Sequence, residues 1–99
     1  MKLQIQSLHF DADVKLLDFI QKKMDKLDTF HDRIIDGEVI LKVEKDANQE
    51  NKIVECKVHI PGSPLFVKER SRTFEAAIDE AVEALKTQLK KQKEKAVRV

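Results

Sequence analysis

Cysteine, glycine and proline are all scarce in this chain of 99 residues, which limits the disulfides, low-complexity segments and linkers that it can contain. The single cysteine, Cys56, cannot form an internal disulfide, which is typical of proteins in a reducing cytoplasm. Two glycines and two prolines leave little room for low-complexity segments or linkers. No apolar run approaches the roughly 20 residues that span a membrane, and the N-terminal residues lack a signal peptide's apolar stretch. We therefore expect residues 1–99 to form one cytoplasmic domain with no membrane partner.

Side chains that could carry chemistry are also few. The candidates for metal ligation are His9, His31, His59, Cys56, Asp11 and Asp13. None of the histidines is paired at metal-ligand spacing, and turn or cap roles explain the two aspartates. The segment 61–64 lacks the lysine and glycine pattern of a phosphate loop, and no serine or cysteine belongs to a nucleophile motif. We therefore expect no enzymatic activity, cofactor, metal or small-molecule substrate.

Four segments alternate between apolar and polar residues, as strands with one buried face do. They are residues 3–10, 38–45, 52–60 and 65–70. The expected inward side chains include Leu3, Ile5, Val39, Leu41, Val43, Val54, Cys56, Val58, Ile60, Leu65 and Val67. Asp36-Gly37 is predicted as a turn and residues 46–51 as a hairpin loop. The opposite face is mostly charged, and Ile40, Ile53 and Phe66 are expected to be exposed on it.

Two segments show the helical period of apolar residues. The first is expected to run from Val14 to about Asp28 with Asp13 as its N-cap, and the second from Thr73 to Lys95 with Thr73 or Ser71 as the cap. Their expected core residues are Leu16, Ile20, Met24 and Leu27 in the first helix and Phe74, Ile78, Ala81, Val82, Leu85 and Leu89 in the second.

The resulting order of elements is β-α-β-β-β-α. Because the first crossover contains a helix, the first two strands should be parallel, and hairpins should make the remaining pairs antiparallel. Since all four strands are apolar on one face, both helices should pack on that face. The sequence therefore predicts an α+β fold, with a four-stranded mixed sheet and two helices on one side.

The end of the second helix is basic. Residues 86–99 contain six basic side chains and one acidic one, a charge of +5; since the whole chain is +1, residues 1–85 carry −4. A helix of this length should overrun strands of ordinary length by a turn or two, so its basic end has no core to bury. Such an end either offsets the helix dipole in solvent or binds a polyanion. A second lysine cluster on the first helix, Lys15, Lys22 and Lys26, favours binding.

Four stretches resemble the ribosome hibernation-promoting factor family, also called ribosome-associated inhibitors or sigma-54 modulation proteins. They are Gln21–Leu27 leading into Asp32–Ile34, Val39–Lys45, Phe74–Asp79 and Leu85–Lys95. The resemblance covers essentially the whole chain in the same order of elements. It is to the family's short form, without the extra C-terminal domain of the long form.

The resemblance implies a βαβββα domain, like double-stranded-RNA-binding domains, that lies in the mRNA and tRNA channel of the small ribosomal subunit. There it would inhibit translation during ribosome hibernation, a response to stress and stationary phase. The family's basic helix positions, together with neighbouring lysines of this chain, give the expected RNA-binding residues Lys22, Lys23, Lys26, Arg33, Lys86, Lys90, Lys91, Lys93 and Lys95. This sequence departs from the family at Leu17, Ala84 and Thr87, where relatives often carry a basic residue, and at Glu69, where a small apolar residue is usual.

Two other functions remain open. A protein-interaction module could use the Ile40, Ile53 and Phe66 patch, or modulate a transcription factor. A general double-stranded RNA binder could use the same lysines without a ribosomal target.

Overall fold

A computed structural model describes the backbone of residues 1–45 and 49–97 and the side chains of residues 1–45 and 49–92. Its strands are β1 (Leu3–Ser7), β2 (Asp36–Val43), β3 (Lys52–His59) and β4 (Leu65–Ser71). Its helices are α1 (Val14–Asp25), the 3₁₀ turn η1 (Lys26–Thr29) and α2 (Phe74–Val97). The predicted order β-α-β-β-β-α is confirmed.

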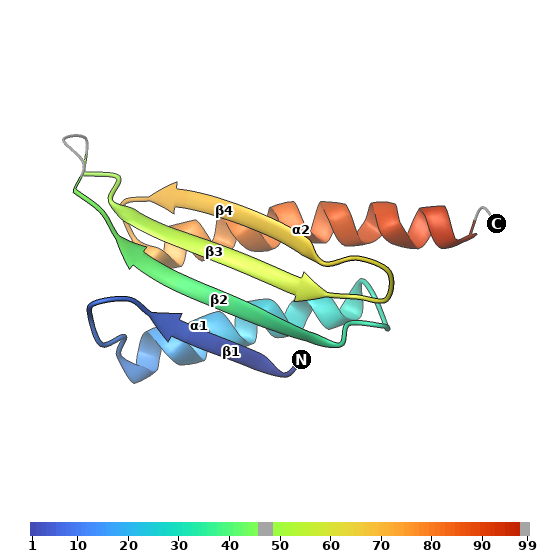
Figure 1. Cartoon of the computed structure of the whole chain (residues 1–99), viewed down its shortest axis with the longest axis horizontal. Coiled ribbons are helices and arrows are strands. Elements are labelled where there is room, and N and C mark those ends of the chain that lie inside the picture. The colour runs from blue at the N-terminus through green and yellow to red at the C-terminus, as the bar shows by residue number, and fades with distance from the viewer. Residues whose placement is uncertain (46–48, 98–99) are drawn as a thin grey trace.

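The sheet has the predicted mixed topology, with strand order β1-β2-β3-β4. Strands β1 and β2 are parallel, and Ile5 lies opposite Val39. The pairs β2–β3 and β3–β4 are antiparallel, so that Cys56 lies between Val39 and Val67. Both helices cover the same face of the sheet (Figure 1).

Helix α1 begins as its sequence predicts and ends earlier. The Asp13 carboxylate accepts a hydrogen bond from the Leu16 amide at 2.8 Å, which satisfies one of the free amides of the first turn. The regular helix ends at Asp25 rather than Asp28, because its last turn tightens into η1. Leu27 is fully buried from η1, so the tightened turn still contributes to the core.

Helix α2 begins at a Thr73 cap, whose hydroxyl accepts a hydrogen bond from the Ala76 amide at 3.1 Å. Ser71 belongs to β4, so the alternative cap is wrong. All six predicted core residues of this helix are buried, and Leu89 is the last buried side chain in the described part of α2. The 24 residues of α2 extend about 36 Å and the seven of β4 about 23 Å, so α2 projects beyond the sheet (Figure 1).

The sheet differs from its prediction at two positions, one on the outer face and one on the inner face. Ile53 is fully buried, and it lies in register between Lys42 and Arg70. Long basic side chains in such positions can cover apolar surface with their stems. Val43, expected in the core, is 49% exposed at the end of β2. Phe66 is 53% exposed, as expected. The predicted apolar patch therefore lacks Ile53, while Ile40 is half-buried and Phe66 is exposed.

Asp36-Gly37 is not a turn, because both residues belong to β2. Gly37 pairs with Leu3 on β1 and Val58 on β3. A Cβ atom at this position would lie 2.9 Å from the Met1 sulfur and 3.0 Å from a Leu3 methyl carbon. Glycine at this position therefore allows the Met1 and Leu3 side chains to pack close to the backbone of β2. It does not reverse the chain.

The folded chain is elongated, with extents of 48 × 26 × 18 Å. A network at Met1 fastens β1 to the end of α1, because the Met1 carbonyl accepts a hydrogen bond from the Gln21 side chain at 3.1 Å. In the described residues, no helix combines the length and the apolar character that crossing a bilayer requires.

Candidate nucleic-acid interface

The predicted RNA-binding residues fall on two neighbouring parts of the helical layer. Lys22, Lys26 and Arg33 are exposed on α1, on η1 and in the connection that follows. On α2, Lys86 is half-buried, and Lys90 and Lys91 are exposed. Lys93 and Lys95 lie in the helical backbone of α2, but their side chains lie outside the described part.

The two groups of lysines are joined at Phe30, which directly follows η1. The ammonium nitrogens of Lys86 and Lys90 lie 4.9 Å and 5.3 Å from the centre of the Phe30 ring. This contact sets two cations of α2 beside the element that carries Lys26. We call Phe30, Lys86 and Lys90 the lysine–aromatic cluster.

Lys23 differs from the other candidates, because its charge is already engaged. Its ammonium nitrogen lies 3.0 Å from a carboxylate oxygen of Asp79 on α2 and 5.4 Å from the centre of the Phe19 ring. The side chain is 31% exposed in the seam between the two helices. The structure therefore gives Lys23 a contact that holds α1 against α2, and leaves it less charge for a ligand.

The acidic residues beside Lys22 and Lys26 are partly neutralised by the N-terminal amine. The Met1 ammonium donates to Asp25 at 2.8 Å and to Asp28 at 2.7 Å. These hydrogen bonds raise the pKa of the Met1 amine above 8.0 and lower the pKa of Asp25 below 3.8.

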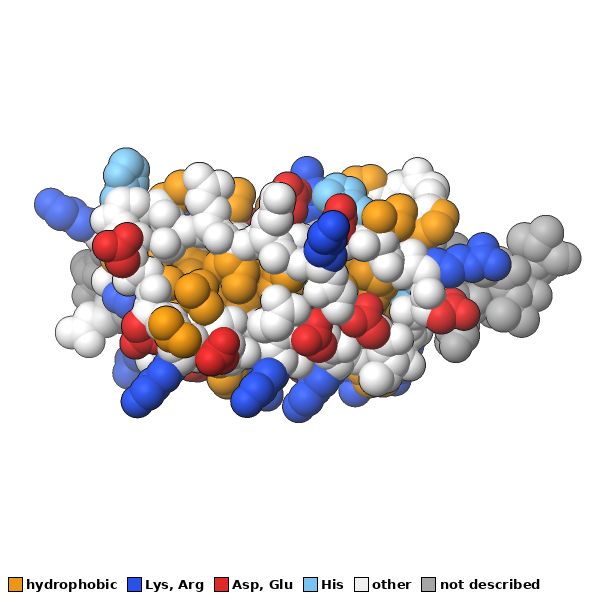
Figure 2. All heavy atoms as spheres, turned by 90° about the horizontal axis from the view of Figure 1, so that it is seen from below, with side chains coloured by type: hydrophobic (Ala, Val, Ile, Leu, Met, Phe, Trp, Pro, Cys, Tyr) orange, Lys and Arg blue, Asp and Glu red, His pale blue; other side chains and the backbone are white. Residues whose placement is uncertain are grey.

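Basic and acidic side chains lie close together on the surface. Figure 2 shows Lys and Arg side chains in a row along one margin of the face that it displays, close to acidic side chains. The paired amine makes the α1 side of the surface less acidic than its sequence suggests.

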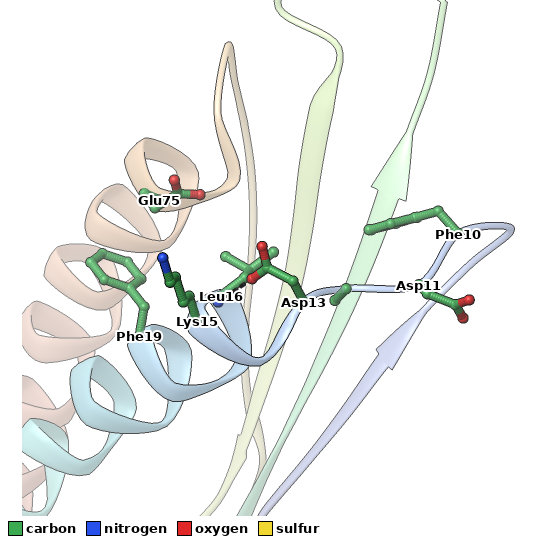
Figure 3. A pocket seen from close by; sticks show the side chains of 8 residues that line it. Phe10, Asp11, Asp13, Lys15, Leu16, Phe19 and Glu75 are labelled. Atoms are coloured by element: carbon green, nitrogen blue, oxygen red, sulfur yellow. Dashed lines mark hydrogen bonds between the residues drawn. The ribbon is translucent and has the colours of Figure 1, made fainter.

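A cleft at the other end of the helical layer has the opposite character. It has a volume of about 500 Å³, and its lining residues include Phe19, Glu75, Asp11, Asp13 and Lys15. Figure 3 shows Lys15, Phe19 and Glu75 around its mouth, with Asp11 turned away. Three carboxylates against one ammonium disfavour a phosphate ligand. This cleft is therefore a poorer candidate for a nucleic-acid contact than the basic end of α2.

Asp36 and His59 form a pair that the sequence did not reveal. Their positions are 23 residues apart, and the β2–β3 register brings the Asp36 carboxylate against the His59 ring. Within the described residues, no group of three His, Cys, Asp or Glu side chains is placed to hold a metal ion. The pair is therefore a cross-strand contact at the end of the sheet.

Comparison with known proteins gives one family. The model of the "Sigma 54 modulation protein / S30EA ribosomal protein" family matches residues 3–97. A ribosome hibernation promoting factor of Pseudomonas putida is 33% identical over 95 residues, which cover 96% of this chain and 89% of the relative.

Two solved structures are similar throughout. The N-terminal domain of Thermus thermophilus Protein Y matches with a TM-score of 0.79 and 28% identity, over 92% of this chain and 98% of that one. A ribosomal subunit interface protein of Coxiella burnetii matches with a TM-score of 0.83 and 26% identity, over 94% of this chain and 98% of that one.

Proposed function

This chain belongs to the sigma 54 modulation protein / S30EA ribosomal protein family, and from that premise we propose that it is a ribosome hibernation factor that binds the small subunit. Similar proteins are named ribosome hibernation promoting factor and ribosomal subunit interface protein, which supports a ribosomal partner. The observation that carries the proposal is the basic end of α2. There Lys90 and Lys91 directly follow Leu89, beyond which the helix projects past the sheet.

Phosphate neutralisation is the chemistry that this end offers. Each ammonium that meets a phosphate releases condensed counterions, so binding should weaken steeply as salt rises. We assign phosphate contacts to the exposed lysines of α2 and to Lys22, Lys26 and Arg33. Lys93 and Lys95 continue the same basic run in the sequence. Lys23 contributes least in this assignment, because Asp79 already pairs with it.

We infer that inhibition follows from occlusion. Phosphate contacts fix position without reading bases, and folded RNA is recognised mainly by its shape. A domain 48 Å long and 18 Å thick in the channel for mRNA and tRNA would exclude both ligands by its bulk. The domain as a whole would be the ribosome-binding unit, with residues 86–99 as its most basic part.

The proposed role needs no catalysis, cofactor or small-molecule substrate. It calls only for a surface of suitable charge and shape, and the exposed lysines of the helical layer are the candidate for that surface. Because ribosomes work in the cytoplasm, the proposed site of action is cytoplasmic. Expression in stress or stationary phase would fit a factor that silences idle ribosomes.

The alternatives have less support. The protein-interaction hypothesis depended partly on an exposed patch of Ile40, Ile53 and Phe66, but Ile53 is fully buried. The family description includes sigma 54 modulation, but none of the relatives and solved structures described above is named as a modulator of a transcription factor or as a general duplex-RNA binder. The ribosomal hypothesis therefore remains the best supported of the three.

Cosedimentation with isolated subunits tests the proposal. The purified protein is mixed separately with small and large subunits at physiological salt, and each mixture is pelleted through sucrose. We expect saturable recovery with the small subunit, little with the large one, and no displacement by excess unrelated duplex RNA. Recovery with neither subunit, or full displacement by the duplex, would favour another function.

A further inference from the structure

Lys86 and Lys90 lie one helical turn apart on α2, and both ammonium groups lie over the same aromatic ring. The distances to the Phe30 ring centre are 4.9 Å and 5.3 Å. Two like charges at this spacing repel, so without a common attraction the side chains would spread into solvent. The negative face of an aromatic ring attracts a cation within about 6 Å, and here it attracts two.

Phe30 is held on the protein side of this cluster. Its amide donates to the Leu27 carbonyl at 3.0 Å, and Leu27 is fully buried. The ring is half-buried beside α2, whose neighbouring core residues Leu85 and Leu89 are fully buried. The ring can therefore hold the two ammonium groups from below while their other hydrogens remain open to a ligand.

Another lysine–aromatic contact, between Lys23 and Phe19, provides an internal comparison. Lys23 lies over Phe19, but the Asp79 carboxylate 3.0 Å away neutralises it. Among the described side chains, neither Lys86 nor Lys90 forms an ion pair. Of these two lysine–aromatic contacts, the one at Phe30 is therefore the one whose ammonium groups have no carboxylate partner among the described side chains.

We propose that Phe30 is a positioning residue, whose ring gathers Lys86 and Lys90 into one binding site for an RNA backbone phosphate. Long lysine side chains lose rotamer freedom when a ligand fixes them, and a pair that is already gathered loses less. Phe30 touches no phosphate itself and acts through the two ammonium groups. The inference rests on the proposed function, since it assigns a specific part of that surface.

A double-mutant cycle on affinity for isolated small subunits tests this assignment. Phe30→Leu is compared in the natural chain and in a Lys86→Gln, Lys90→Gln background. In the natural chain the loss should be about three- to tenfold, the scale of one or two cation–π contacts. In the glutamine background it should nearly vanish, because no cations remain for the ring to gather. Phe30→Tyr, which keeps the ring, should retain binding.

Phe19→Leu is the matched control, because it removes a half-buried ring beneath a lysine that already has a carboxylate partner. Its effect on subunit affinity should be small. Thermal unfolding of each variant establishes that the compared proteins are folded. In the free protein, NMR should show ring-current shifts at the ε-methylenes of Lys86 and Lys90 that disappear in Phe30→Leu.

Equal losses in the two backgrounds would mean that Phe30 acts only through the fold, and would overturn the inference. So would an unchanged affinity of Phe30→Leu in the natural chain. If the natural protein binds no small subunit, the proposed function fails and the inference fails with it. Binding by the natural protein without coupling to the two lysines refutes the inference alone.

Discussion

Cys56 is fully buried at the centre of the sheet. Burial, with a further contribution from the Glu69 charge, raises the pKa of its thiol to about 12. The reactive form is the thiolate, so we expect almost no alkylation of the native protein by iodoacetamide at pH 8. Mass spectrometry should show rapid, complete modification once denaturant unfolds the chain. Fast labelling under native conditions would place the thiol outside the core.

The ion pairs of Met1 give stability a dependence on pH. The lowered pKa of Asp25 stabilises the folded state at pH values above the ordinary pKa of 3.8. This contribution is lost as pH falls through the lower pKa that the carboxyl has in the folded state. The raised pKa of the Met1 amine stabilises the folded state at pH values below the ordinary pKa of 8.0. This contribution is lost as pH rises through the higher pKa of the folded state. Asp25→Asn should therefore reduce the urea midpoint most between these limits.

The effect should be small, because Asp25 is 46% exposed and solvent screens the pair. Asp18→Asn is the matched control, since Asp18 is exposed on the same helix and forms no ion pair among the described side chains. The protein must begin at Met1 without an added tag. A difference between the two variants that stays constant from pH 3 to pH 10 would contradict this assignment.

At the scale of single residues, the sequence predicted local contacts and missed distant ones. The Asp13 cap was predictable because its partner amide is three residues away. The contacts of Phe30 with Lys86 and of Lys23 with Asp79 both span 56 residues, so only the folded helix pair brings them together. Basic composition could indicate a binding surface, but it could not distinguish a neutralised lysine from an unpaired one. The predicted RNA contacts themselves remain predictions.

At the scale of elements, the packing of α2 gives a direct test. Leu85 is fully buried on its core face. Leu85→Ala should lower the free energy of unfolding by about 2–5 kcal/mol, through lost apolar burial and the cavity left behind. Glu83→Ala, an exposed change on the same helix, should cost less than about 0.5 kcal/mol. Similar urea midpoints for the two variants would contradict this packing of α2 on the sheet.

Apolar periodicity predicted the elements well, because each helix and strand has one clear buried face. The structure differs from the prediction where a residue's neighbours in the folded sheet decide its role. The Asp36-Gly37 pair predicts a turn, but Gly37 lies in β2, where the absence of a Cβ atom makes room for the Met1 and Leu3 side chains. The sequence predicts an exposed Ile53, but the residue is fully buried between its register partners Lys42 and Arg70. An alternating pattern alone cannot show how far long neighbouring side chains cover an outward residue.

At the scale of the whole molecule, the projecting end of α2 and the cleft near the start of both helices differ in local charge. The basic end of α2 projects beyond the sheet (Figure 1), while the cleft near the start of both helices is lined by Glu75, Asp11 and Asp13. An RNA surface would attract the first end and repel the second, so the protein should approach in one orientation. The net charge of +1 therefore understates the local attraction.

The central claim is that the basic end of α2 binds the small ribosomal subunit through specific contacts rather than through net charge. It is tested by the affinity of Lys90→Glu, Lys91→Glu against a control, Lys2→Glu, Lys45→Glu, in which the exposed lysines lie outside both helices. Each replacement changes the charge by two, so both variants carry −3 in place of +1. Affinity for isolated small subunits is measured over a series of salt concentrations.

We expect the α2 variant to lose affinity steeply, and the slope of log K against log salt to fall by about two units if both lysines meet phosphates. The control should lose little affinity and keep its slope. Equal losses and equal slopes in the two charge-matched proteins would contradict the account, because the end of α2 would then matter only for its contribution to net charge.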